Sequence, residues 1–247
     1  MLGRIANRFL RPFGYRLIAE SFDDQQGLTA EERDLLKRVR PFTMTTVEEI
    51  LALMDAVRYV EKNDIPGAIV ECGVWRGGMM MLAADVLRQT GSEHRDLYLY
   101  DSFEGMPPAS IDDVRFDGRT TEEVKAMEGV EGAWCLATRD EVASNMSSTG
   151  YPRDKVQIVQ GYVEQTIPRE SPDQIAVLRL DTDWYASTKH ELIHLYPRLA
   201  SGGVLIIDDY GYWKGAQKAV DEYFAELEGK LPLLQRVDAH GRVAIKA

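Results

Sequence analysis

Four aspartates stand in two pairs, each directly after a short apolar segment typical of a β-strand. Asp181 and Asp183 follow residues 175–180, and Asp208 and Asp209 close the segment that begins at 204. Side chains two positions apart in an extended chain share a face, so Asp181 and Asp183 are expected to point the same way. If the two strands are neighbours in a parallel sheet, the four carboxylates converge, and mutual repulsion disfavours four bare charges at one place.

A hard divalent cation resolves that conflict. Mg²⁺ binds carboxylate oxygens and keeps positions open for water or for substrate oxygens. The alternative, that these acids cap the helices that follow, accounts for one or two of them but not for two pairs on neighbouring strands. We therefore expect a magnesium site at this edge of the sheet.

A glycine-rich segment follows an earlier apolar stretch, residues 68–72. Gly73, Gly77 and Gly78 let the backbone approach a ligand closely and open the next helix. Val74 and Trp75 stand where a pyrophosphate would be crowded, so the segment is not the GxGxxG dinucleotide fingerprint. A turn that needs glycine for structural reasons alone is the alternative.

Two acids mark the ends of the first two predicted strands. Asp101 lies 30 residues after Glu71, a longer spacing than the roughly 20 typical of dehydrogenases. Acidic strand ends favour a ligand with hydroxyls and a cationic group over one with a diphosphate. S-adenosylmethionine (SAM), which has a ribose, an ammonium and a sulfonium, fits that description.

The elements that must position these residues alternate along the chain. Short apolar segments separated by helical patterns indicate an α/β fold with a doubly wound parallel sheet, in which ligands bind at the carboxyl ends of the strands. The predicted strands cover 68–72, 97–101, 156–160, 175–180 and 204–208, with a closing antiparallel hairpin at 233–237 and 243–245. The predicted helices include 46–62, 78–88, 187–199 and 215–228.

Two regions lie outside this pattern. Residues 1–40 are expected to form an N-terminal arm and a helix that starts at the capping box Thr29–Glu32 and ends at Pro41, ahead of a main domain at 41–247. Residues 102–155 are too long for a simple connection, and we expect them to form a lid that binds the acceptor. Residues 120–123 predict a helix within that lid.

Composition narrows the classes of protein. The chain has 247 residues, 45% hydrophobic and 28% charged, with a formal net charge of -11, which excludes disorder and disfavours a nucleic-acid partner. Two cysteines without a CxxC pair favour a reducing compartment, so a cytoplasmic location is expected, and no apolar run is long enough to span a membrane. The basic residues 1–18 are expected to pack on the domain or on a partner subunit of a homo-oligomer, with a membrane surface as the alternative.

Several segments together resemble the macrocin O-methyltransferase family, whose members methylate sugar hydroxyls of macrolide and novobiocin-type antibiotics. They are Glu71–Gly78, Asp101–Met106, Leu180–Tyr185 and Gly202–Tyr210. The resemblance implies a Rossmann-like class I SAM-dependent methyltransferase fold, Mg²⁺, and methyl transfer to a hydroxyl of a deoxysugar in a glycosylated small molecule, as part of natural product biosynthesis.

The resemblance also implies roles for particular residues. Asp181, Asp208 and Asp209 would bind Mg²⁺, and Asp183 would be the general base. SAM would be bound by Met44, Thr45, Glu71, Gly73, Trp75, Gly77, Asp101, Ser102, Phe103 and Gly161. Trp184 and Tyr185, beside the metal, are expected to meet the sugar ring.

The sequence is also compared with three other functions. Residues 190–194 spell HExxH, a zinc-peptidase signature, but the helical pattern places His190 and His194 opposite the apolar face, and no third ligand follows. A nicotinamide-dependent oxidoreductase has a similar fold, although GxGxxG is missing. A non-catalytic module that binds SAM or a metal would keep the same site without turnover.

Overall fold

The computed structural model describes residues 27–129, 134–229 and 231–247, and the chain divides into two units, Met1–Arg38 and Val39–Ala247. Helix α2 (Ala30–Val39) begins at the predicted capping box. The backbone N–H of Glu32 donates to Oγ1 of Thr29, and the backbone N–H of Thr29 donates to the Glu32 carboxylate. The basic arm predicted at residues 1–18 lies outside the described residues.

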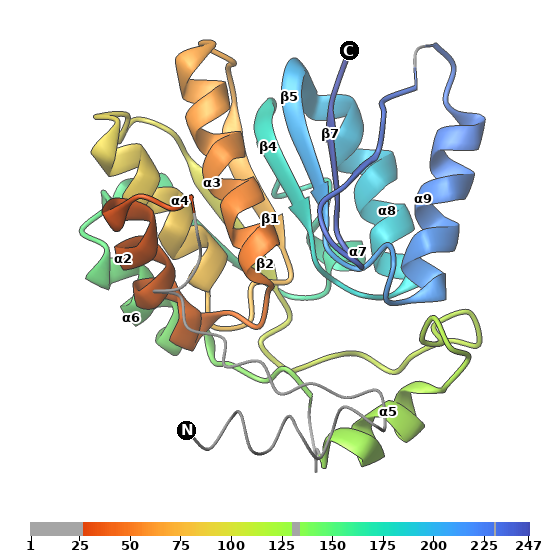
Figure 1. Ribbon diagram of the computed structural model, residues 1–247. Coiled ribbons are helices and arrows are strands. Elements are labelled where there is room, and N and C mark those ends of the chain that lie inside the picture. The colour runs from red at the N-terminus through yellow and green to blue at the C-terminus, as the bar shows by residue number, and fades with distance from the viewer. Residues whose placement is uncertain (1–26, 130–133, 230) are drawn as a thin grey trace. The chain divides into compact units, whose positions relative to one another are not determined.

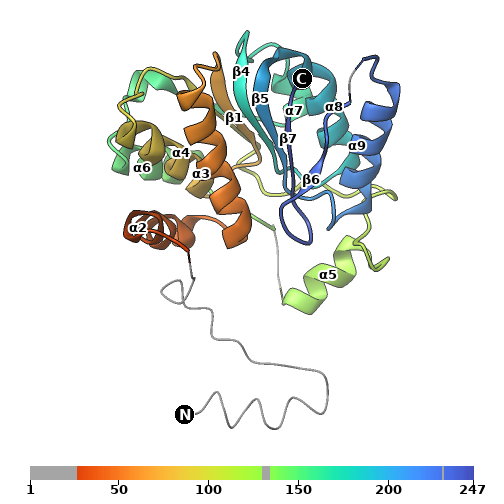
Figure 2. The same cartoon turned by 45° about the horizontal axis from the view of Figure 1, so that its top comes forward.

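A seven-stranded sheet has the order β3-β2-β1-β4-β5-β7-β6. The first five strands are parallel, and β7 runs antiparallel to both β5 and β6. This confirms the predicted α/β fold with its closing hairpin, which Figure 2 shows at one edge of the sheet. The strands are β1 (Ala68–Cys72), β2 (Leu97–Asp101), β3 (Val156–Gln160), β4 (Ile175–Leu180), β5 (Leu199–Ile207), β6 (Gln235–Arg236) and β7 (Arg242–Ile245).

Helices cover both faces of the sheet: α3, α4 and α6 lie on one side and α7, α8 and α9 on the other (Figure 1). Such two-sided cover explains why every residue of β1 and β4 is buried. The helices are α3 (Val47–Lys62), α4 (Gly78–Gln89), α5 (Thr121–Glu128), α6 (Arg139–Ser148), α7 (Val163–Thr166), α8 (Tyr185–Leu195) and α9 (Lys214–Glu226), with 3₁₀ turns at η3 (Arg40–Phe42), η4 (Arg153–Lys155) and η5 (Tyr196–Arg198). In the described part of the chain, no helix has the length and apolar character needed to cross a membrane.

The predicted helix 187–199 is shorter in the structure. Helix α8 ends at Leu195, and the 3₁₀ turn η5 contains Pro197, which has no N–H to continue the helix. The chain then enters β5 at Leu199, earlier than the predicted start at 204. In the closing hairpin, β6 contains two residues only, fewer than predicted, whereas β7 begins one residue earlier than predicted.

The chain between β2 and β3 has two parts. Helix α6 packs against α4 and β3 and so belongs to the helical layer. The part before it passes beneath the carboxyl ends of the strands and includes α5 (Figure 1). We call this part, residues 104–129 and 134–138 as described, the lid segment.

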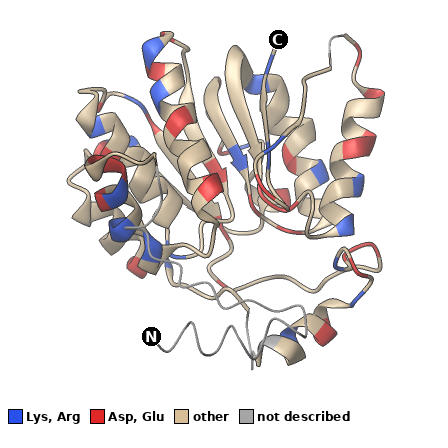
Figure 3. Cartoon of the chain, viewed as in Figure 1, with Lys and Arg blue, Asp and Glu red and all other residues tan. Residues whose placement is uncertain are grey.

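The strand order reverses between β1 and β4, because β2 and β3 lie beyond β1 whereas β5 lies beyond β4. In open parallel sheets this reversal creates the crevice where ligands bind. Acidic residues gather at the same lower ends of the central strands (Figure 3). The sheet therefore brings the sequence-predicted carboxylates to its switch point.

Candidate active site

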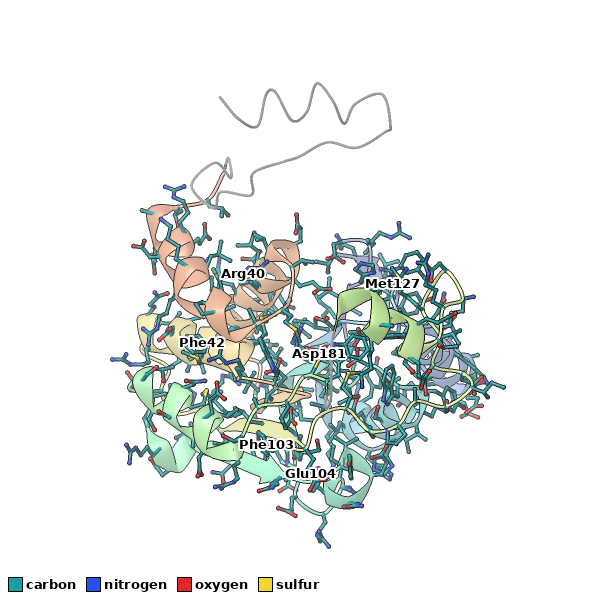
Figure 4. All side chains as sticks on the ribbon, turned by 90° about the horizontal axis from the view of Figure 1, so that it is seen from below. Arg40, Phe42, Phe103, Glu104, Met127 and Asp181 are labelled. Carbon is teal, nitrogen blue, oxygen red and sulfur yellow. The ribbon has the colours of Figure 1, made fainter. Side chains whose placement is uncertain are left out.

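A cavity of about 530 Å³ opens at the carboxyl ends of β1, β2, β4 and β5. Seen from below the sheet, Asp181 lies near the middle of this region, with Phe42, Phe103 and Met127 around it (Figure 4). The cavity lining includes all four predicted aspartates of the metal and base site: Asp181, Asp183, Asp208 and Asp209. One cavity thus joins the predicted cofactor segments to the predicted metal site.

Asp181, Asp208 and Asp209 form a cluster with the spacing of a metal site. Each offers a carboxylate oxygen, and these oxygens lie within 4.8 Å of one another, the one such group among the described residues. The backbone fixes two of them, because Asp181 N donates to Cys72 O and Asp208 N donates to Leu180 O, extending the strand pairing past the strand ends. The acids predicted from the strand ends therefore do converge.

The chemistry of this cluster fits a divalent cation. Burial raises the pKa of Asp181 to about 7, with Asp208 adding to the effect, and burial raises the pKa of Asp209 well above its usual value. Oδ2 of Asp209 is buried and has no hydrogen-bond partner. Carboxylates that resist ionising together, with an oxygen left unpaired, are the donor set that a hard cation stabilises.

Asp183 lies beside this cluster, but the backbone conformation that places it there differs from the predicted extended chain. Strand β4 ends at Leu180, so the alternation of an extended chain no longer applies at Asp183. Its φ of 68° is in the left-handed region, so the backbone is no longer extended at this residue. The Oδ1 atom then accepts a 2.7 Å hydrogen bond from Nε1 of Trp213. Burial and Asp181 raise the pKa of Asp183 well above its usual value.

Arg179 is a fully buried cation beneath the cluster, and its role was not predicted. Its Nη1 donates to Glu71 over 2.5 Å and to Asp181 over 2.6 Å. Its Nη2 donates to Oγ1 of Thr45 and to Asp208. Residue 179 precedes Asp181 by two positions in the chain, so the alternation of β4 was a signal that would have placed both on one face.

Glu71 is the second-last residue of β1 and Asp101 the last residue of β2, the two strands on the cofactor side. Oε2 of Glu71 is buried without a hydrogen-bond partner, which fits a cationic ligand group, and burial raises the pKa of Glu71 to about 8. Both oxygens of Asp101 accept backbone N–H groups: Oδ2 from Val74 and Trp75, and Oδ1 from Phe103. Asp101 therefore shapes the loop after β1.

Most residues predicted to bind SAM line the cavity. These are Met44, Thr45, Glu71, Gly73, Trp75, Asp101, Ser102 and Gly161. Gly77 and Phe103 lie outside the lining. Gly77 caps α4 with a φ of 83°, and the backbone N–H of Phe103 donates to Asp101. Gly73 tolerates no side chain, because a Cβ there would lie 1.9 Å from the carbonyl oxygen of Asp181.

An aromatic wall closes the other side of the cavity. Trp213 packs edge-on against Trp184 and Tyr212, with ring centroids 5.0 Å apart in both pairs, and against Trp134 at 6.1 Å. Of the two residues expected to meet a sugar ring, Trp184 lines the cavity, whereas Tyr185 is not part of the lining and its hydroxyl donates to Glu222 on α9. Sequence reasoning also missed His240, which the β6–β7 turn brings to the cavity.

The HExxH segment on α8 has no geometry for zinc. Glu191 is fully buried and accepts a hydrogen bond from Oγ1 of Thr182, away from the two histidines. The ring centroids of His190 and His194 lie 4.4 Å apart, with the ring planes tilted by 56°. Both residues are half-buried, more than predicted, and Nε2 of His190 is hydrogen-bonded to the carbonyl of Ile167. Glu191 and His190 thus have separate partners, and among the described residues this segment contributes to no group with metal-ligand spacing, which argues against a zinc-peptidase site.

Fold and cavity together define the class of protein. The sheet order with its antiparallel closing strand, and the cofactor-type loop after β1, are those of a Rossmann-like SAM-dependent methyltransferase. The model of the family described as Macrocin-O-methyltransferase (TylF) matches residues 16–244. The chain belongs to this family, and it is an SAM-dependent O-methyltransferase.

Characterised relatives are consistent with that assignment. The chain is 33% identical over 186 residues to demethyldecarbamoylnovobiocin O-methyltransferase from Streptomyces niveus, covering 75% of this chain and 69% of the relative. It is 35% identical over 181 residues to mycinamicin III 3''-O-methyltransferase from Micromonospora griseorubida, covering 73% and 69%. The solved structure of the O-methyltransferase NovP has a TM-score of 0.72 at 30% identity, covering 83% of this chain and 82% of NovP.

Proposed function

We propose that this enzyme transfers a methyl group from SAM to a sugar hydroxyl of a glycosylated small molecule and that it requires Mg²⁺. The observation that carries the proposal is the group of four acids at one cavity edge: three spaced as metal ligands and a fourth, Asp183, oriented by its own hydrogen bond. Relatives that act on glycosylated small molecules support the choice of acceptor.

Each residue then has a defined task. Glu71, with an unpaired buried oxygen, receives a cationic group of SAM, and the loop held by Asp101 forms the cofactor wall. Asp181, Asp208 and Asp209 would hold Mg²⁺, which would supply positive charge to stabilise the negative charge that develops on the acceptor oxygen. Asp183 lies next to these ligands and accepts the proton.

Methyl transfer moves one methyl group and one proton. The acceptor oxygen attacks the methyl carbon as the carbon–sulfur bond breaks, and S-adenosylhomocysteine (SAH) leaves. The hydroxyl proton moves to a carboxylate oxygen of Asp183. Because the sulfonium is already an activated leaving group, the main contribution of the protein is to align the oxygen, the methyl group and the base.

The lining also favours one class of acceptor. Among the described lining residues there are nine acids and neither lysine nor arginine. A diphosphate would meet these carboxylates without a basic side chain to bind it. We infer that the acceptor is a neutral or amino-bearing glycoside, with its sugar already attached to an aglycone, and not a nucleotide diphosphate sugar.

Methyl transfer from labelled SAM to a panel of glycosides tests the proposal. We expect transfer with Mg²⁺, none in excess EDTA, and recovery when Mg²⁺ is restored. Asp183→Asn should bind SAH and Mg²⁺ normally in calorimetry yet lose most turnover. Full activity in EDTA would refute the metal requirement, near wild-type turnover of Asp183→Asn would refute the base, and a preference for nucleotide diphosphate sugars would refute the acceptor class.

A further inference from the structure

We propose that Trp213 is a positioning residue for Asp183: its indole N–H holds the carboxylate in the orientation that accepts the proton, and its backbone joins that carboxylate to the lid segment. The inference rests on the proposed role of Asp183 as the base. It adds a residue from the start of α9, thirty positions further along the chain, to the machinery of the reaction.

The hydrogen bond defines one orientation of the carboxylate. Nε1 of Trp213 lies 2.7 Å from Oδ1 of Asp183, and Trp213 is 2% exposed, so water does not compete for this donor. An indole N–H donates and cannot accept a proton. It therefore fixes Oδ1 and leaves the second oxygen of Asp183 to receive the proton of the acceptor.

The ring that carries this donor is itself held in place. Trp184 and Tyr212, which belong to the same aromatic wall, pack edge-on against Trp213. Trp134 of the lid segment also packs edge-on against it. The backbone N–H of Trp213 donates to the carbonyl of Asp209 over 3.1 Å. Trp213 is thus tied both to the base and to a residue of the metal cluster.

The lid segment pairs with the backbone around Trp213. Residues 114–116 run antiparallel to residues 212–214, with a bridge between Arg115 and Trp213. Phe116 N donates to Tyr212 O over 2.8 Å, and Lys214 N donates to Val114 O over 2.9 Å. The lid segment and the base therefore share one support, and a shift of the lid segment changes the position of the donor to Asp183.

Trp213→Phe removes the N–H and keeps an aromatic ring in the wall. Because a hydrogen bond to a charged group contributes more than a neutral one, we expect kcat to fall by about 10- to 100-fold. The acceptor KM and the calorimetric Kd values for SAH and Mg²⁺ should stay within about twofold of wild type. Tyr196→Phe, which removes the hydroxyl from another buried aromatic ring outside the site, should leave kcat unchanged.

A double-mutant cycle separates this inference from the proposed function. If Trp213 acts through Asp183, Trp213→Phe should cost nothing further in the Asp183→Asn background. A multiplicative loss in the double variant, a fall in SAH or Mg²⁺ affinity in step with kcat, or wild-type kcat in Trp213→Phe would each overturn the inference. Wild-type kcat in Asp183→Asn alone would instead refute the base assignment.

Discussion

Arg179 and Glu71 join the two central strands of the sheet through a buried ion pair, with 2.5 Å between Nη1 and Oε1. The arginine is 1% exposed and the glutamate 2% exposed. The same guanidinium also contacts Asp181 and Asp208, so this one side chain pairs with acids on the cofactor side and with acids of the proposed metal site. Removing it would leave several buried carboxylates without their counter-charge.

Arg179→Met should therefore lower the free energy of unfolding by about 3–5 kcal/mol, the usual cost of breaking one side of a buried ion pair. Urea unfolding in EDTA measures this change. Arg169→Met is the matched control, because Arg169 makes an exposed ion pair with Glu170 and its loss should have a far smaller effect. Equal stability of the two variants would show that Arg179 does not balance the cluster.

Asp101→Asn should weaken SAH binding by at least about tenfold, since an amide nitrogen would face one of the backbone N–H donors now bound by a carboxylate oxygen. The donors belong to Val74, Trp75 and Phe103, so the loop after β1 would lose its shape. Calorimetric titration with SAH measures the effect. Asp96→Asn, just before β2, should leave the SAH affinity unchanged, and similar losses in both variants would contradict the prediction.

Glu49→Gln should remove a pH dependence of stability. Burial, with Asp208 adding to it, raises the pKa of Glu49 from 4.5 to about 10. Between those values the folded protein keeps a proton that the unfolded chain has lost, so the contribution of Glu49 to stability falls as pH rises from 4.5 toward 10. Urea midpoints in EDTA should decline less steeply with pH in Glu49→Gln than in wild type.

The neighbouring substitution Glu48→Gln is the control for this pH series, because Glu48 is exposed on the same turn of α3. Its midpoints should follow those of the wild type across the range. A Glu49→Gln series that runs parallel to the wild type would mean that Glu49 ionises in the folded protein as it does in the unfolded chain.

Asp209→Asn should reduce Mg²⁺ affinity by at least about tenfold, because an amide supplies less charge to a hard cation than a carboxylate does. The rise in melting temperature with added Mg²⁺ reports this loss, since a ligand stabilises the folded state according to its concentration relative to Kd. Asp221→Asn, an exposed acid on α9, should keep the wild-type response. An unchanged Mg²⁺ response in Asp209→Asn would remove that residue from the metal site.

Much of the fold could be predicted because the central strands are apolar apart from Glu71 in β1 and Arg179 in β4. Strands β1 and β4 are buried on both faces, which the continuous apolar segments indicate directly. The ends were harder to place, as the early start of β5 shows, because the turn at Pro197 and the glycines at 202 and 203 obscure where the strand begins.

The candidate site could be predicted where it depends on strand ends, and less well where it depends on contacts between distant segments. Asp181, Asp208 and Asp209 follow their strands directly, so the topology alone brings them together. The hydrogen bond between Asp183 and Trp213 needs a left-handed turn after β4, which no local sequence pattern predicts.

The lid segment is a continuous part of the domain with a defined start and a defined end. Its start is closed by the turn in which Ser102 Oγ donates to Gly105 O, and its end by Thr138, which caps α6. Between these points it is pinned to the rest of the domain at the bridge between Arg115 and Trp213. We propose that the lid segment binds the acceptor, so that replacing this segment would change the acceptor and leave the SAM side of the cavity as it is.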